Sequence, residues 1–254
     1  MLAAERHARI TEMVHSAQIV RTDVLVRELG VSAETIRRDL LALEERGVLK
    51  RVHGGAASAE PSVFQELPVE ERRRLGAGAK RRIGQAAASL VRDGQIIMID
   101  IGTTAAAVAH ALPPKLEATV VTNSLVVATE LADRPGLDVL VSGGRVRSGD
   151  LALSDATAVR FFSNVYPDLA FLGSGGLHHE VGLTDYYLDE ITVRKTVLHN
   201  ARRSYALVAA EKFGRIAGHR VCSLGELTGI VTDTEPDGEL KAALDDHSVE
   251  IVTA

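Results

Sequence analysis

The stretch from residue 32 to residue 55, SAETIRRDLLALEERGVLKRVHGG, constrains the fold of this chain more than any other. Ser32 can cap a helix, because its hydroxyl accepts a hydrogen bond from a free backbone N–H of the first turn. Gly47 can end that helix, since glycine adopts the left-handed conformation of a C-cap at little cost. Between them, four apolar residues recur at helical spacing and predict one apolar side: Ile36, Leu40, Leu41 and Leu43.

The flanking segments complete a helix-turn-helix with a wing. Thr22 to Leu29 is a short amphipathic segment, and Gly30-Val31-Ser32 supplies the tight turn between two helices. Val48 to Val52 alternates apolar and basic residues, and Gly54-Gly55 closes a turn, which is typical of a small hairpin. A first helix is expected from Leu2 to His15.

Several polar residues of this motif are placed to contact DNA. The second helix of a helix-turn-helix enters the major groove, where Arg37 and Arg38 can bind guanine edges or phosphates. Basic residues of the wing are expected at the DNA backbone or the adjacent minor groove. Arg6 and Arg9 of the first helix are expected to be exposed, near the backbone at most. The residues predicted to bind DNA are Ser32, Thr35, Arg37, Arg38, Lys50, Arg51 and His53.

The alternative is a solvated helix face. A pair between Glu34 and Arg38 at i,i+4 contributes only about a few tenths of a kcal/mol and has no bearing on function. However, a cap, a turn, a helix, a glycine stop and a basic hairpin follow one another here in the order that a winged helix-turn-helix requires. That order favours DNA binding.

The bulk composition is that of a globular protein with an aliphatic core, because 46% of residues are hydrophobic and only 4% are aromatic. The net charge of −5 argues against indiscriminate coating of nucleic acid but permits a local basic surface. Cys222 is the single cysteine, which excludes an internal disulfide and indicates a reducing compartment. No signal peptide or membrane span is recognisable, so we expect a cytoplasmic protein.

The chain divides into two predicted domains. Residues 58–75 contain Pro61 and Pro68 and lack periodicity, so they are expected to link a DNA-binding domain at 1–57 to a second domain at 76–254. In the second domain, Ile96 to Ile99 is a continuous apolar run, as in a parallel strand covered on both faces. Further strands are expected at 119–121, 137–141, 169–172, 205–208, 229–231 and 249–252, with helices between them. This alternation predicts an α/β domain with a mainly parallel sheet.

Polar, glycine-rich segments follow four of these strands. Ligands of parallel sheets bind beyond the carboxyl ends of the strands. Asp100-Ile101-Gly102-Thr103-Thr104 leads directly into a helix, so hydroxyls and free N–H groups form a candidate phosphate cradle. Segments 122–124, 142–145 and 173–176 are similar, and Arg145 can add a charged contact. Each segment alone is ordinary turn chemistry, but the four together predict a shared anion-binding crevice.

Two sets of motifs resemble the DeoR family of bacterial transcription regulators. The first is Arg6-x-x-x-Ile10-x-x-x-Val14 followed by Ser32-x-x-Thr35-Ile36-Arg37-Arg38-Asp39-Leu40. The second set lies in the predicted α/β domain: Asp100-x-Gly102-Thr103-Thr104, Thr122-Asn123, Gly143-Gly144, Gly182-Leu183-Thr184, Glu190, Lys212-Phe213-Gly214 and Thr232-Asp233. The resemblance implies a winged helix-turn-helix and a sensor domain that resembles sugar-phosphate isomerases and responds to a phosphorylated sugar.

Strand-end chemistry and this resemblance together define the candidate effector site. Its residues are Asp100, Gly102, Thr103, Thr104, Asn123, Gly143, Gly144, Arg145 and Lys212. The chain departs from the family pattern at Ala209, where an aspartate usually precedes the lysine by three residues. That polar contact is therefore absent, or replaced by Glu211, which bears on the identity of the effector more than on the fold.

An enzymatic reading remains as the alternative function. Isomerases need a carboxylate base and a group that stabilises an enediolate oxygen. The residues with suitable side chains are Asp100, Asp185, Glu190 and Lys212. The fused DNA-binding motif favours a sensor without catalytic residues. Arg194 and Lys195 are expected on the polar face of the helix that contains Glu190.

Two further signals are weak. His178-His179-Glu180 lacks a further ligand at metal-binding spacing, so no metal site is expected. Cys222 has no convincing base beside it and is expected to be structural. The residues therefore predict a cofactor-free, ligand-controlled regulator, and the resemblance to the DeoR family implies a repressor of carbohydrate-metabolism genes that a phosphorylated sugar controls. Its partner is double-stranded operator DNA, and two half-sites imply a homo-oligomer.

Overall fold

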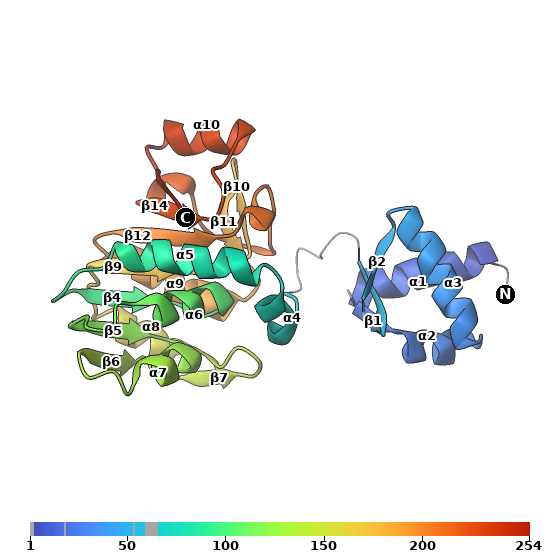
Figure 1. The fold of residues 1–254 in the computed structure, drawn as a ribbon, viewed down its shortest axis with the longest axis horizontal. Helices are drawn as coiled ribbons and strands as arrows, with labels where there is room; N and C mark the ends of the chain where they lie inside the picture. The colour runs from blue at the N-terminus through green and yellow to red at the C-terminus, as the bar shows by residue number, and fades with distance from the viewer. Residues whose placement is uncertain (1–2, 18, 53, 59–65) are drawn as a thin grey trace. The chain divides into compact units, whose positions relative to one another are not determined.

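The computed structural model describes residues 3–17, 19–52, 54–58 and 66–254 (Figure 1). These residues form two compact units, Met1–Glu66 and Leu67–Ala254. Within the linker expected at 58–75, residues 59–65 lie outside the described residues. Val69–Arg74 form helix α4 of the second unit.

The first unit is a winged helix-turn-helix. Helices α1 (Ala3–Ala17), α2 (Thr22–Leu29) and α3 (Ala33–Glu45) accompany an antiparallel sheet of strand order β1-β3-β2. Its strands are β1 (Ile19–Arg21), β2 (Leu49–Val52) and β3 (Gly55–Ser58). The predicted helices and hairpin are confirmed, whereas β1 was not predicted. Its three residues carry no pattern of their own.

The cap and stop of α3 are those predicted from the sequence. The Ser32 hydroxyl accepts a hydrogen bond from the Thr35 N–H at 3.2 Å, and Gly47 has a φ of 70°. Ile36, Leu40 and Leu43 are buried, but Leu41 is 43% exposed, so its predicted place on the apolar side was wrong. A helix advances by about 100° per residue, which places Leu41 well outside the stripe that the other three residues form.

The second unit contains a seven-stranded, wholly parallel sheet of strand order β15-β14-β12-β9-β4-β5-β6. Its strands are β4 (Ile96–Ile99), β5 (Ala118–Thr122), β6 (Leu137–Val141), β9 (Leu169–Leu172), β12 (Ser204–Val208), β14 (Gly229–Thr232) and β15 (Glu250–Thr253). Every strand expected from the apolar runs is present, and the predicted α/β architecture is confirmed.

Two helical layers cover this sheet (Figure 1). Ile97 and Ile99 of β4 join one core with α5 (Ala77–Ser89), α6 (Thr103–Ala111) and α7 (Leu125–Leu131). Met98, from the same strand, joins a second core with α8 (Ala156–Phe162), α9 (Leu188–Asn200) and α10 (Gly238–Asp246). Successive side chains of a strand point to opposite faces, which is why a continuous apolar run supplies both cores.

Several short elements of the second unit were not predicted. A three-stranded sheet contains β10 (Gly176–His178), β11 (Gly182–Asp185) and β13 (His219–Cys222), and β7 (Arg145–Arg147) pairs with β8 (Ala152–Ser154). Two short 3-10 helices, Ala210–Lys212 and Leu224–Glu226, follow β12 and β13. In the described part of the chain, no helix is both long enough and apolar enough to cross a membrane.

Candidate DNA-binding and effector-binding sites

Helix α3 presents two arginines to solvent. Arg37 and Arg38 are both exposed. Arg37 lies 3.3 Å from Glu34, rather than Glu34 pairing with Arg38, and both side chains of this pair are more than 60% exposed. Exposed ion pairs contribute little to stability, so Arg37 can exchange Glu34 for another anion at small cost.

The wing is fastened to the end of α3. Lys50 and Arg51 are exposed on β2. The Arg51 backbone N–H donates to Glu44 Oε1 at 2.8 Å, and its guanidinium lies 3.9 Å from the same carboxylate. Glu44 therefore holds the basic strand beside the recognition helix. His53, predicted to bind DNA, lies outside the described residues.

Arg6 is not an exposed residue, so that expectation was wrong. Its guanidinium donates to both carboxylate oxygens of Asp39, at 2.5 and 2.9 Å, and His7 Nε2 lies 3.0 Å from Oδ1. Asp39 is 6% exposed. The hydrogen bond from Arg6 lowers the pKa of Asp39, although burial opposes this shift. Two motif residues that are far apart in sequence thus join α1 to the recognition helix, and Arg6 is not available to DNA.

In the second unit, loops after three parallel strands touch one another at the carboxyl edge of the sheet. Asp100 Oδ2, after β4, accepts a hydrogen bond from the Gly173 N–H at 2.8 Å. The Ser174 hydroxyl donates to Leu207 O of β12 at 2.8 Å, and the Lys212 ammonium donates to Ser174 O. The structure therefore brings Asp100 and Lys212 to connected loops.

The N-terminus of α6 lies at this edge. Gly102 precedes the helix with a φ of 101°, and no side chain caps it. Thr103 is half-buried and Thr104 is buried. The first N–H groups of a helix have no partner within the helix and attract anions. This arrangement has the chemistry of the predicted phosphate cradle.

Asn123 and Asp100 each retain an unpartnered oxygen. Both residues are fully buried. The Asn123 amide donates to Leu153 O at 3.3 Å, but its Oδ1 has no hydrogen-bond partner among the described residues, and neither has Asp100 Oδ1. Buried acceptors without donors are costly, so both atoms are candidates to accept hydrogen bonds from a bound ligand.

Arg194 was placed wrongly by the sequence reasoning. It is only 2% exposed and not part of a polar helix face. Its guanidinium lies 2.5 Å from Asp100 and 2.6 Å from Asp185, and these carboxylates raise its pKa against the opposing effect of burial. The sequence signal that could have shown this is helical spacing, since Arg194 lies three residues after Ile191 and three before Val197, both of which are buried.

Arg145 and Thr103 border different clefts. Thr103 lines a cleft of about 530 Å³ between α5 and α6, together with Lys80 and Arg81. Arg145 lines a second cleft of about 480 Å³ with Glu190, and its exposed guanidinium lies 2.8 Å from Asp189. Gly143 and Gly144 form the turn before Arg145, both with positive φ.

The position of the missing family aspartate is filled by apolar packing. Ala209 is buried, and the next N–H, that of Ala210, donates to Asp233 Oδ1 at 2.8 Å. Glu211 is exposed and faces Gly76 at the start of α5. Glu211 therefore does not take the place of the absent carboxylate.

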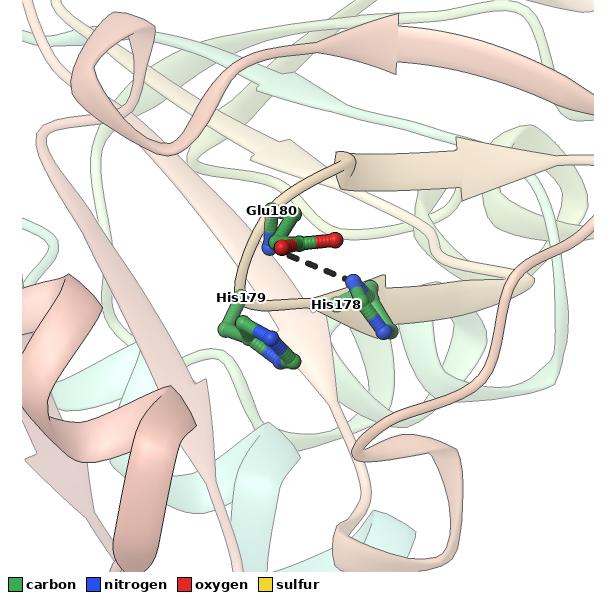
Figure 2. A group of neighbouring side chains, drawn as sticks. All are labelled: His178, His179 and Glu180. Atoms are coloured by element: carbon green, nitrogen blue, oxygen red, sulfur yellow. Dashed lines mark hydrogen bonds between the residues drawn. The ribbon is translucent and has the colours of Figure 1, made fainter.

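Figure 2 shows His178, His179 and Glu180 at the turn between β10 and β11. Potential ligand atoms of the three lie within 4.8 Å of one another. However, His178 Nδ1 accepts a hydrogen bond from the Glu180 N–H at 3.2 Å, which puts the proton of the neutral ring on Nε2. His179 lies 3.4 Å from Glu239. These contacts close the turn and leave no nitrogen lone pair of His178 open.

Two other candidates have environments that argue against catalysis. Burial raises the pKa of the Cys222 thiol to about 12, so the nucleophilic thiolate is disfavoured. Burial also raises the pKa of Glu190, although Arg194 and Arg147 oppose the shift. Arg147 Nε lies 2.5 Å from Glu190, which already engages this carboxyl group.

Comparison with known proteins gives consistent matches along the chain. The family model described as DeoR-like helix-turn-helix domain matches residues 6–62, and the one described as DeoR C terminal sensor domain matches residues 76–234. The glycerol-3-phosphate regulon repressor of Escherichia coli is 33% identical over 251 residues, covering 99% of each chain. The transcriptional repressor CsqR of Escherichia coli is 31% identical, covering 97% of this chain and 94% of CsqR.

Solved structures show more distant likeness. Ribose 5-phosphate isomerase A from Methanocaldococcus jannaschii aligns with a TM-score of 0.41 at 19% identity, over 54% of this chain and 55% of the isomerase.

Proposed function

The chain belongs to the DeoR family of DNA-binding transcription regulators, and from this premise we propose that it represses carbohydrate-metabolism genes under the control of a phosphorylated sugar. The named repressors among its relatives support repression. The observation that carries the DNA-binding part is the pair of exposed arginines on α3, a helix whose N-terminus is capped by Ser32 and whose end is fastened to a basic wing.

The proposed contacts divide by role. Arg37 and Arg38 read bases or phosphates in the major groove, while Lys50 and Arg51 neutralise backbone phosphates. Operator binding is therefore specific in sequence and weakened by salt, since phosphate contacts release counterions. Two half-sites bind a homo-oligomer, and the protein acts in the cytoplasm, where its operator is found.

Operator binding tests this proposal. On a promoter fragment from its own locus, Arg37→Ala and Arg38→Ala in the full-length protein should each weaken binding by about tenfold or more, since a bidentate base contact contributes about 1–3 kcal/mol. Arg202→Ala removes an exposed arginine of the second unit and serves as the control. Equal binding of the wild type to any DNA sequence, or unchanged binding by both variants, would overturn the assignment of α3.

The effector part rests on the carboxyl edge of the sheet. The uncapped N-terminus of α6 suits a phosphate, and the unpartnered oxygens of Asp100 and Asn123 suit the hydroxyl donors of a sugar. We propose that the sugar phosphate releases the protein from its operator. For this, the ligand must bind one arrangement of the protein more tightly than the other.

We propose that this site binds its ligand without turnover. The carboxylates that an isomerase would use as a base are held by arginines: Asp185 by Arg194, and Glu190 by Arg147. Lys212 donates to Ser174 O. Assays with sugar phosphates should detect no isomerisation. Measurable turnover that disappears in Lys212→Ala would instead support an isomerase-like enzyme fused to a DNA-binding module.

A further inference from the structure

We infer that Arg72 of α4 is coupled to the effector crevice, the carboxyl edge of the sheet around Asp100 and Lys212, through a network of charged side chains (the charge network), so that the state of the crevice determines how firmly α4 is docked. This inference rests on the proposed function, because it describes how the proposed effector site is connected to the helix at the start of the second unit. The first unit ends at Glu66 and α4 begins at Val69. Helix α4 is therefore the first helix of the sensor that the connecting chain reaches.

Polar contacts, not apolar packing, hold α4 in place. None of its residues is buried. Arg72 Nη2 lies 2.5 and 2.6 Å from the two oxygens of buried Asp150, and Arg72 Nε donates to Leu67 O at 2.8 Å. The ammonium of buried Lys80 donates to the carbonyls of Arg72 and Leu75. A short helix without buried side chains has low local stability, so the loss of a single such contact releases it readily.

The ion pairs continue from Asp150 towards the crevice. Arg147 Nη1 lies 2.9 Å from Asp150, and its Nε lies 2.5 Å from Glu190. In the part of the chain that the structure describes, Glu190 and Arg194 form no direct ion pair, but they lie one helical turn apart on α9, a spacing at which opposite charges attract. Arg194 in turn binds Asp100, the residue that precedes the candidate phosphate cradle.

The charges of the charge network do not cancel. Three arginines (Arg72, Arg147 and Arg194) serve four carboxylates, Asp100, Asp150, Asp185 and Glu190. Arg147 and Arg194 are each shared between two carboxylates, and burial limits screening by water and salt. Removing one charge therefore leaves a neighbouring charge without one of its partners, and that neighbour then interacts more strongly with the partner that remains. A ligand that donates a hydrogen bond to the unpartnered Oδ1 of Asp100 likewise changes the attraction between Asp100 and Arg194.

Hydrogen exchange of the full-length protein tests this coupling without DNA or a ligand. Arg72→Gln should accelerate exchange of the α4 amides by about tenfold or more, because it removes a partly buried ion pair. Asp100→Asn, at the other end of the charge network from Arg72, should also accelerate exchange of the α4 amides. If the two positions are coupled, the effects in the double variant should not multiply.

Matched controls separate coupling from general damage. Arg74→Gln removes an exposed charge from the same helix and should leave α4 exchange unchanged. Slow exchange of β12 in each variant shows that the sheet remains folded. If the Asp100→Asn variant does not fold, Glu190→Gln can replace it, because this substitution interrupts the charge network at its middle with little change of side-chain shape.

Two results would overturn the inference: unchanged α4 exchange in a folded crevice variant, or independent, multiplying effects of the two substitutions. Because this measurement needs neither operator nor sugar phosphate, its failure would leave the proposed function standing. Conversely, if the protein bound neither an operator nor a sugar phosphate, the hydrogen-exchange result would be unaffected.

Discussion

At the scale of single residues, the contact between Arg6 and Asp39 links parts of the DNA-binding unit that are far apart in sequence. Both residues belong to the motif that resembles the DeoR family, and the structure gives them a structural role behind the recognition helix. Arg37 and Arg38, immediately before Asp39, point to solvent instead. Neighbouring residues on one helix thus divide between anchoring α3 and facing solvent, where we propose that they contact DNA.

The state of Asp39 should make stability depend on pH. Its pKa in the folded protein is below the unfolded value of about 3.9, so the ionised form stabilises the fold above that pH. This contribution is lost as pH falls through the folded-state pKa. Asp39→Asn should therefore lower the melting temperature of the full-length protein near neutral pH.

Calorimetry at several pH values provides the check. The difference in melting temperature between wild type and Asp39→Asn should shrink as the pH falls below about 4. Asp23→Asn, which removes an exposed carboxylate of α2, is the control. A difference that stays the same at acid pH would show that the ion pair is not the source of the stabilisation.

The burial and contacts of a side chain could not be predicted from the sequence where they depend on partners that are distant in the sequence. Ser32 was identifiable as a cap because its partner is three residues away. Arg194 was not identifiable as buried, because Asp100, one of the two carboxylates that neutralise it, reaches it only through the folding of the sheet. Local chemistry is visible in sequence, whereas long-range charge pairing is not.

At the scale of elements, the same distinction explains which segments were predicted. The strands of the parallel sheet are continuous apolar runs, and their pattern alone identifies them. Strands β7, β8 and β10 have three residues each, too few for any periodicity. Arg147 lies on β7 and His178 on β10. Because β7 was not predicted, the charge network that includes Arg147 could not be anticipated either.

The packing of α5 on α6 depends on a small residue. A Cβ added to Gly84 would lie 2.4 Å from Ala107 O of the neighbouring helix. Gly84→Ala must therefore push the helices apart and should reduce the free energy of unfolding by about 1–3 kcal/mol. Urea denaturation followed by circular dichroism measures this loss.

A second glycine of α5 gives the matched control. A Cβ at Gly78 would meet only the end of the Arg82 side chain at 3.9 Å. Gly78→Ala should leave stability unchanged or raise it by at most about 1 kcal/mol, because alanine favours helix. If both substitutions had the same effect, close helix packing at Gly84 would not be the cause.

At the scale of the whole molecule, effector binding should appear as stabilisation. A ligand that binds only the folded protein raises its melting temperature, by roughly 5–10 °C at about 100 times its Kd for a unit of this size. We expect such a rise with one member of a panel of sugar phosphates. The panel pairs each sugar phosphate with its unphosphorylated counterpart.

Variants of the full-length protein locate the binding site. Thr103→Ala and Lys212→Ala should abolish the rise, whereas Thr129→Ala, which removes an exposed hydroxyl from α7, should keep it. A rise that survives in both crevice variants would place the ligand elsewhere. No rise with any compound would contradict the phosphate cradle but leave operator binding intact.

The order of strands in the sheet has a consequence for how the protein is made. Strand β4 lies between β5 and β9, and the central strand β9 ends at Leu172, so much of the chain must leave the ribosome before β4 and β9 can pair. The first unit needs only residues up to Glu66. With synthesis at about 5–20 residues per second, a nascent chain carries a DNA-binding unit for roughly ten seconds or more before its sensor is complete. During that interval the first unit exists without the domain that we propose responds to a metabolite.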